Sequence, residues 1–306
     1  TRYVDTAIPH IPVTAHGLKE NGYATIATTN WLPYSWSINN VAFAEVMHTA
    51  LSYFQAGRAD AGYKLLKSSV LDGMYLGDSP GNFGQISFYD AARGECYRDF
   101  GDPIGVASRV LIQGLFGILP DALNQQIILR PGFPDDWDKA SVSTPDISYR
   151  FTRKENTDTY HITQRFQTPL HPVLHVNARK EKIRSVKVNG VPATWQSIES
   201  AHGYPLLSIQ AEGTSSTTIT IEWEGAPLHT LAVQEPVITS NGKLALQIPS
   251  GASISQVYDP QSILANHTVE ATAFNAQIKG EPGHHTFFVY THQGEMDWWQ
   301  PVNIYI

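Results

Sequence analysis

The sequence predicts an α+β multidomain protein, in which a helical region of about three helices precedes β-sandwich domains. Three observations lead to this prediction. Apolar residues recur at helical spacing between residues 38 and 117, and the period changes from 3.6 to 2 near Leu119. Clusters of Gly, Pro, Asn and Asp then recur about every ten residues, a spacing typical of β-sandwiches.

The first helix is predicted over residues 38–57. Ser37, Asn39 and Asn40 are residue types that cap helix N-termini. Five positions then recur at helical spacing, and Gly57 ends the segment: Val41, Ala44, His48, Leu51 and Phe54. We expect His48, on this apolar face, to be a hydrogen-bonded core histidine. Residues 1–36, rich in Pro, Thr, Gly and aromatic residues, show no helical period.

Two further helices are predicted over residues 60–76 and 103–117. Asp60 is a possible cap for the first of them, and the link of about three residues before it predicts an antiparallel helical hairpin. Asp102-Pro103 is a strong helix start, because the carboxylate can cap the helix and proline suits its first position. Gly117 and Pro120 end that helix.

Most of residues 127–306 are predicted to be β-structure. Alternation is clear at residues 186–188 and 218–223, and Asn189-Gly190 indicates a hairpin turn. We expect three regions: 1–122 helical, 123–226 a β-sandwich and 227–306 a second small β domain. In Asp297-Trp298-Trp299-Gln300, adjacent side chains of a strand point to opposite faces, so one Trp should pack inside and the other should face a neighbour or a ligand.

Composition excludes several classes of function. The chain has 306 residues and a net charge of -7, which disfavours nucleic-acid binding. No apolar stretch approaches the roughly 20 residues that span a bilayer, so no membrane is expected. The single cysteine, Cys96, allows no internal disulfide. The chain begins at Thr1 without a signal peptide, which suggests processing or a piece of a longer protein.

The loop pattern predicts where a functional site would lie. The segments entering the first and third helices are long, at about residues 1–37 and 77–102, whereas the link between the first two helices is short. In an antiparallel array the two long segments fall at one end, which carries the N-termini of the first and third helices. Long loops in a compact domain are usually functional.

The segment Tyr89–Asp102 is the sharpest feature of these loops. It holds four carboxylates, two arginines and two tyrosines. Glycosidic cleavage needs two carboxylates, and nearby arginines keep a carboxylate ionised, as a base or nucleophile requires. Glu95 is the first candidate for that role and Asp99 the second, with three neighbours as substrate-binding candidates: Asp90, Arg93 and Arg98. An ion-pair network of Arg93, Glu95, Arg98 and Asp99 that braces the loop is the alternative.

The other long segment carries aromatic and amide side chains. Trp31 and Trp36 are candidates for a sugar platform, and Asn40 could bind hydroxyls; the alternative is aromatic packing and ordinary helix capping. His284 and His285 are adjacent, so in a strand they point to opposite faces and make poor joint ligands. No metal and no cofactor are expected.

Four segments carry a resemblance to a known family: residues 28–50, 65–84, 92–121 and the phrase LRPGFPDDWD at 129–138. Together they resemble the C-terminal end of six-hairpin glycosidases of Bacteroidetes type, in which an (α/α)6 barrel is followed by a β-sandwich. The resemblance covers roughly residues 25–150. It implies cleavage of glycosidic bonds in a plant or microbial polysaccharide or oligosaccharide, in the periplasm or outside the cell.

The sequence departs from this family in one respect. An (α/α)6 barrel has twelve helices and this chain shows about three, so the chain would be its C-terminal portion. The resemblance then implies two partners, a carbohydrate substrate and the N-terminal remainder of the barrel, which would supply the general acid. The fragment alone should be inactive. The alternative is a non-catalytic carbohydrate-binding or structural β-sandwich module.

Overall fold

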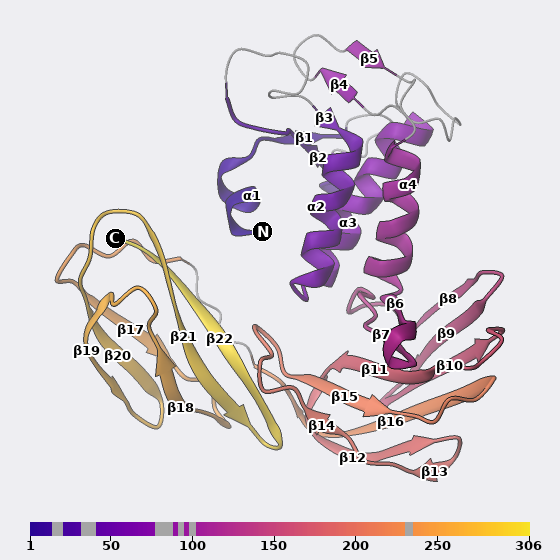
Figure 1. Cartoon of the computed structure of the whole chain (residues 1–306). Helices are drawn as coiled ribbons and strands as arrows, with labels where there is room; N and C mark the ends of the chain where they lie inside the picture. The colour runs from indigo at the N-terminus through magenta and orange to yellow at the C-terminus, as the bar shows by residue number, and fades with distance from the viewer. Residues whose placement is uncertain (14–20, 32–40, 77–87, 91–94, 98–101, 230–234) are drawn as a thin grey trace. The chain divides into compact units, whose positions relative to one another are not determined.

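The computed structural model describes residues 1–13, 21–31, 41–76, 88–90, 95–97, 102–229 and 235–306 (Figure 1). The chain divides into two compact units, Thr1–Trp137 and Asp138–Ile306. Within the described residues the first unit carries the α-helices, and the second is built of strands. The predicted fold class, a few helices followed by β-sandwich domains, is therefore confirmed.

A helical hairpin forms the centre of the first unit. Helices α2 (Phe43–Gln55) and α3 (Ala59–Val70) are antiparallel and joined by three residues, as predicted. Gly57 in this link has a φ of 74°, which glycine adopts without strain. α3 continues into a π-helical turn, η2 (Leu71–Leu76), and α4 (Asp102–Arg109) continues into a second, η3 (Val110–Leu115).

The start of the first predicted helix differs from the prediction. Residues Val41–Ala42 form a short strand, β3, and α2 begins only at Phe43. Ala42, the N-cap residue, is extended, with φ -106° and ψ 107°, and makes no side-chain capping hydrogen bond. The predicted caps Ser37, Asn39 and Asn40 lie outside the described residues.

The assignment of His48 to the core was wrong, because its side chain is exposed. The buried stripe of α2 follows Phe43, Met47, Ala50 and Phe54. The other four positions chosen from the sequence, Val41, Ala44, Leu51 and Phe54, are buried as predicted. The predicted Asp60 cap was also wrong: Asp60 lies inside the first turn of α3, where its Oδ1 accepts a hydrogen bond from the Asp135 N–H at 3.3 Å.

The first residues contain structure that the sequence did not predict. α1 (Arg2–Ala7) precedes an antiparallel pair, β1 (His10–Pro12) and β2 (Ala24–Ile26). Asp5 of α1 accepts a hydrogen bond from the Tyr53 hydroxyl and pairs with the Arg58 guanidinium. Contacts to distant residues therefore hold this short helix, and isolated helices of this length are unstable in water.

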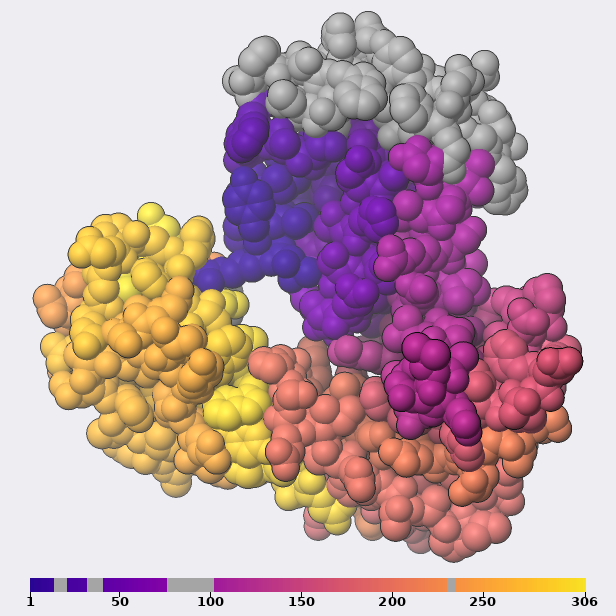
Figure 2. Space-filling model, in the orientation of Figure 1, coloured from indigo at the N-terminus to yellow at the C-terminus, as the bar shows by residue number. Residues whose placement is uncertain are grey.

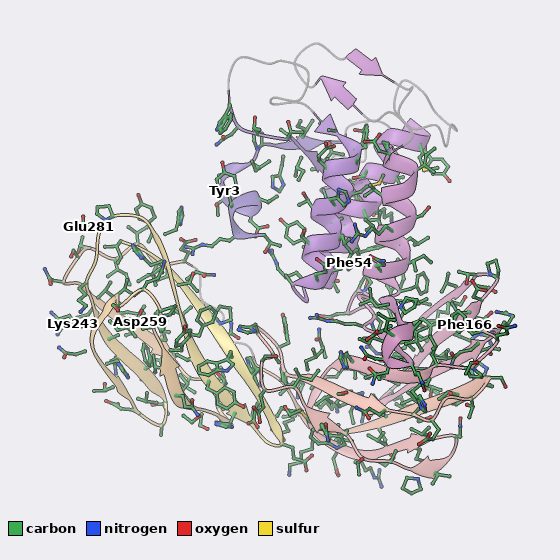
Figure 3. All side chains as sticks on the ribbon, viewed as in Figure 1. Tyr3, Phe54, Phe166, Lys243, Asp259 and Glu281 are labelled. Carbon is green, nitrogen blue, oxygen red and sulfur yellow. The ribbon has the colours of Figure 1, made fainter. Side chains whose placement is uncertain are left out.

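Glycines let the helices of the first unit approach one another closely. The ring of Phe54 (labelled in Figure 3) is buried against three of them. A Cβ atom would lie 3.0 Å from this ring at Gly62, 2.6 Å at Gly114 and 2.4 Å at Gly132. Because real Cβ contacts are longer, these positions require glycine, and Phe54 fixes η3 and residue 132 onto the hairpin.

A β-hairpin follows the last helical turn, where the change of period predicted it. It comprises β6 (Ile118–Asp121) and β7 (Gln126–Leu129), with the 3-10 turn η4 (Ala122–Asn124) between them. At Gly117, which precedes β6, φ is 63° and a Cβ would lie 1.9 Å from the Arg130 carbonyl oxygen. Only glycine fits this turn.

The second unit begins with antiparallel β-structure. Its six-stranded sheet has the order β13-β12-β16-β10-β9-β8, and its strands are β8 (Lys139–Ser143), β9 (Ile147–Lys154), β10 (Thr157–Gln164), β12 (Lys180–Val188), β13 (Val191–Pro192) and β16 (Ser216–Pro227). β11 (His171–Asn177), β15 (Leu206–Gln210) and β14 (Gln196–Ser197) also pair antiparallel. The predicted Asn189-Gly190 turn joins β12 to β13, with positive φ at both residues.

The C-terminal residues, orange to yellow in Figures 1 and 2, form two three-stranded sheets. One has the order β17-β20-β19: β17 (Lys243–Gln247), β20 (Ala273–Ile278) and β19 (Leu264–Val269). The other has the order β18-β21-β22: β18 (Ala252–Tyr258), β21 (His284–Gln293) and β22 (Met296–Tyr305). Their inner faces share one apolar core, which includes Phe274, Phe287 and Val302. This packing is that of a small β-sandwich.

Candidate functional site

Backbone pairing joins the second long segment of the first unit to the residues that lead into α2. β3 pairs with β4 (Phe88–Asp90), so that Val41 is the register partner of Tyr89 and Ala42 that of Phe88. β4 pairs in turn with β5 (Glu95–Tyr97). Since β3 leads directly into α2, this small sheet lies at the helix N-terminus, as Figure 1 shows. This pairing brings residues 88–90 of the second long segment to the entry of α2; Val41 and Ala42 follow the first long segment, residues 1–37, so the meeting of the two segments stays a prediction.

The hairpin of β4 and β5 places two candidate residues opposite each other. Asp90 is the register partner of Glu95, and Tyr89 is that of Cys96. The chain then reaches Asp102, the first residue of α4, which is followed by the buried Pro103. The structure therefore brings the Glu95 position to the helix end that the sequence predicted.

Several predicted site residues lie outside the described residues: Trp36, Asn40, Arg93, Arg98 and Asp99. The ion-pair network proposed as the alternative role of this loop is therefore untested. Trp31 is among the described residues, and 66% of its surface is exposed. Its backbone N–H donates a hydrogen bond to Thr29 Oγ1 at 3.2 Å. An exposed indole is available for stacking, but its predicted platform partner, Trp36, is among the residues not described.

The electrostatics of this end favour an anion or a hydrogen-bond acceptor. Ala42, the N-cap residue of α2, offers no side-chain cap to the backbone N–H groups of the first turn, which have no acceptor within the helix. Aligned peptide dipoles give such a terminus a partial positive charge. Glu45, in the same first turn, is exposed to solvent.

A buried carboxylate elsewhere in the chain is structural. Asp158 of β10 is 1% exposed and accepts hydrogen bonds from Arg153 at 3.0 Å, Arg179 at 2.9 Å and the Trp223 indole N–H at 3.0 Å. A substrate has no access to a side chain so enclosed. These contacts satisfy a charge that would be costly to bury alone.

Metal ligation and membrane insertion are two further properties that the described residues bear on. Within the described ranges no group of three His, Cys, Asp or Glu residues could hold a metal ion. In the same part of the chain, no helix is long and apolar enough to span a bilayer.

The sequence interpretation missed one cluster of exposed functional groups. Tyr258, Tyr290, His292, Asp297 and Trp299 gather on the outer face of β18-β21-β22. The signal was present as aromatic residues at alternate positions of residues 284–305, but the partner strand that completes the cluster could not be identified from the sequence. The prediction that Trp298 and Trp299 face opposite ways is confirmed, because Trp298 is fully buried and Trp299 is not.

Comparison with known proteins gives only distant similarities. No protein-family model and no curated protein sequence matches the chain. Among solved structures, an α-L-rhamnosidase from Dictyoglumus thermophilum matches with a TM-score of 0.39 and 12% identity over 60% of this chain and 21% of the rhamnosidase. The chain thus spans about one fifth of that protein's length.

Two smaller proteins also match. Tandem Ig repeats of Dlar give a TM-score of 0.17 and 10% identity, over 49% of this chain and 89% of that one. The N-terminal periplasmic domain of ScsB from Proteus mirabilis gives a TM-score of 0.14 and 8% identity, over 55% and 98%. Similarity at this level assigns neither a family nor an activity to the chain.

Proposed function

We propose that this chain is the C-terminal portion of a glycoside hydrolase that acts on a plant or microbial polysaccharide or oligosaccharide, in the periplasm or outside the cell. The observation that carries the proposal is the pairing of β3 with β4 and of β4 with β5. It brings the strands that contain Asp90 and Glu95 to the N-terminal end of α2. Enzymes of this class build their sites from loops that a rigid scaffold positions.

In this proposal Glu95 is the base or nucleophile, and Asp99 supports it. Asp90, Arg93 and Arg98 would contact the substrate, with Trp31, Trp36 and Asn40 from the other segment. Hydrolysis needs a second carboxyl group that protonates the leaving oxygen from the other side of the bond. One loop does not flank both sides of a sugar, so the acid would come from barrel helices outside this chain.

Exposed apolar residues on α4 and η3 support the proposal that a further barrel helix packs against them. Ile104 of α4 is 38% exposed and Leu111 of η3 is 40% exposed. Residues seven apart lie on one face of a helix, so the two side chains make an apolar stripe that a further barrel helix would cover. Tyr75 of η2, at 58% exposure, adds to the uncovered apolar surface of this unit.

The proposal is tested by assaying the complete parent protein and the 306-residue chain side by side. Both would be incubated with a panel of p-nitrophenyl glycosides and with plant and microbial polysaccharides, and released p-nitrophenol and reducing ends would be measured. We expect turnover by the parent and little or none by the chain alone. Robust turnover by the 306-residue chain would contradict the proposal that it is only a portion of the enzyme. A parent protein that is inactive on the whole panel would contradict the proposal that it is a glycoside hydrolase.

A further inference from the structure

The outer face of the C-terminal sheet β18-β21-β22 carries an unusual set of aromatic side chains. Along β21 and β22 the residues alternate, and the inner set is fully buried in the sandwich core, including Phe287, Val289 and Ile304. The outer set is only partly buried. On that outer face Tyr290 is the register partner of Trp299, and Tyr258 of β18 is that of Phe288.

These four rings form a continuous aromatic face, defined here by Tyr258, Phe288, Tyr290 and Trp299. The ring centroids of Tyr290 and Trp299 are 4.9 Å apart, and those of Tyr258 and Trp299 are 6.4 Å apart. Tyr258 stacks on Phe288 at 6.1 Å. Tyr258 is nevertheless 58% exposed, so its ring offers surface to a ligand.

A polar trio of Ser255, His292 and Asp297 borders the aromatic face. The rings of His292 and Tyr290 are 5.1 Å apart. His292 Nδ1 is hydrogen-bonded to Asp297 Oδ1, and His292 Nε2 lies 2.7 Å from Ser255 Oγ. Because a carboxylate only accepts, Nδ1 donates to Asp297, and in the neutral ring Nε2 accepts from the serine hydroxyl. The trio is therefore held in one orientation, with the His292 and Asp297 side chains 37% and 35% exposed.

The backbone of Trp299 is also held by hydrogen bonds to residues 201 and 203. The Trp299 N–H donates to the Ala201 carbonyl at 2.9 Å, and the Trp299 carbonyl accepts from the Gly203 N–H at 2.8 Å. The ring of His202, between them, packs edge-on against Phe288 at 5.7 Å. A platform held on both sides loses little conformational entropy when a ligand binds.

Partly exposed rings beside fixed polar groups match the chemistry of a sugar. A pyranose ring presents C–H groups on one face, which pack on an aromatic ring, and hydroxyl groups at its edge, which bond to polar side chains. Asp297 and Glu199 are the acidic groups near Tyr290. Partial burial, followed by the charges of these two carboxylates, raises the pKa of Tyr290 and keeps its phenol protonated as a donor. The same charges disfavour an anionic ligand.

A serine–histidine–aspartate chain is also the arrangement of a hydrolytic nucleophile, but this position lacks the other requirement. Catalysis by such a chain needs N–H donors aimed at the oxyanion that forms. In a sheet the N–H groups lie in the plane of the strands and pair with the neighbouring strands, as they do along β21 and β22, which pair in continuous register. Ser255 of β18 lies in a β-bulge between Ile254 and Gln256, and a single bulged residue offers one N–H rather than a converging pair of donors. The geometry favours binding over catalysis.

We infer that the aromatic face and the polar trio form a binding site for a neutral glycan, separate from the proposed catalytic end of the helices. A sugar ring stacks on the exposed ring of Tyr258, beside Trp299, whose ring is inclined at 69° to it, and the trio orients hydroxyl groups of the glycan. The inference does not rest on the proposed hydrolase activity, because the site lies entirely in the second unit.

The test is affinity electrophoresis of the 306-residue chain in native gels that contain arabinoxylan, pectic galactan or hydroxyethyl cellulose. We expect at least one of these polymers to retard the chain. Tyr258→Ala and Trp299→Ala should each weaken binding about tenfold or more, as the loss of a central aromatic contact does. The matched control is Tyr305→Ala, which removes another aromatic side chain, 39% exposed, from the same face of β22; its binding should equal that of the native chain.

Three results would overturn the inference: no retardation by any of the polymers, native binding by the Tyr258→Ala chain, or equal weakening by Tyr305→Ala. Since Tyr258 is mostly exposed, its replacement should leave the fold intact, and this variant keeps the test decisive even if Trp299→Ala unfolds. Binding is measured without turnover, so a failure here and a failure of the glycosidase assay are separate outcomes.

Discussion

Val41 and Tyr89 are register partners in an antiparallel strand pair. The first of them lies two residues before α2, and the second begins the segment that contains Glu95. This pairing fixes the residues that lead into α2 against the segment that leads into α4. It is the structural reason for placing a functional site at this end of the helices.

Gly117→Ala should destabilise the first unit strongly. The new Cβ would lie 1.9 Å from the Arg130 carbonyl oxygen, so the turn into β6 would have to move. Gly57→Ala is the matched control, because its φ of 74° is also positive but nothing lies within 4 Å of the new atom. Left-handed backbone alone should cost about 1–2 kcal/mol at Gly57, and Gly117→Ala should cost clearly more. Urea unfolding midpoints measure both, and equal losses would refute the close approach.

Asp158→Asn should destabilise the second unit by about 3–5 kcal/mol, because two arginines would be left without their buried carboxylate. The control is Glu222→Gln, which breaks the ion pair with Arg184 at 3.1 Å on the surface. Exposed pairs contribute about 1 kcal/mol or less. Unfolding in guanidinium chloride gives both losses. A loss below about 1 kcal/mol for Asp158→Asn would mean that the arginines find other partners at little cost.

Tyr53 should make the attachment of α1 sensitive to alkaline pH. Burial, the hydrogen bond to Asp5 and the charge of that carboxylate raise the pKa of the Tyr53 phenol in the folded protein. The unfolded value is about 10. A raised folded pKa means that the stabilisation is fully present below pH about 10 and is lost as the pH rises further.

Tyr53→Phe measures this effect. At pH 8 the variant should be less stable by about 1.5–3 kcal/mol, the contribution of a hydrogen bond to a charged acceptor. The difference between native and variant chains should shrink as the pH passes 10, when unfolding is followed by circular dichroism. Tyr3→Phe, which alters a side chain that is 60% exposed, should change stability little at pH 8. A native–variant difference that grows above pH 10 would contradict the assignment.

The sequence predicted those elements whose stability is encoded locally. The spacing of apolar residues and Gly57 predicted the α2–α3 hairpin, and Asp102-Pro103 predicted the start of α4. Alternation and Asn189-Gly190 predicted the β12–β13 hairpin. In each case neighbouring residues provide most of the signal.

Elements that depend on distant partners could not be predicted in this way. α1 is held by Tyr53 and Arg58, which lie far along the chain. β3, β4 and β5 have two or three residues each and exist through their mutual pairing, so no run of residues identifies them. The exposed position of His48 depended on a choice between neighbouring helix faces that the sequence alone did not decide.

The role of Glu95 is the central claim, and one variant of the complete parent protein tests it most directly. Glu95→Gln keeps the shape of the side chain and removes its charge. It should lower kcat about a thousandfold, the order seen for an essential catalytic group, with little change in Tm. Glu45→Gln is the control, since Glu45 is exposed in the first turn of α2, and it should keep the native rate. If Glu95→Gln instead keeps the native rate and melts several degrees lower, Glu95 braces an ion-pair network and the catalytic assignment is wrong.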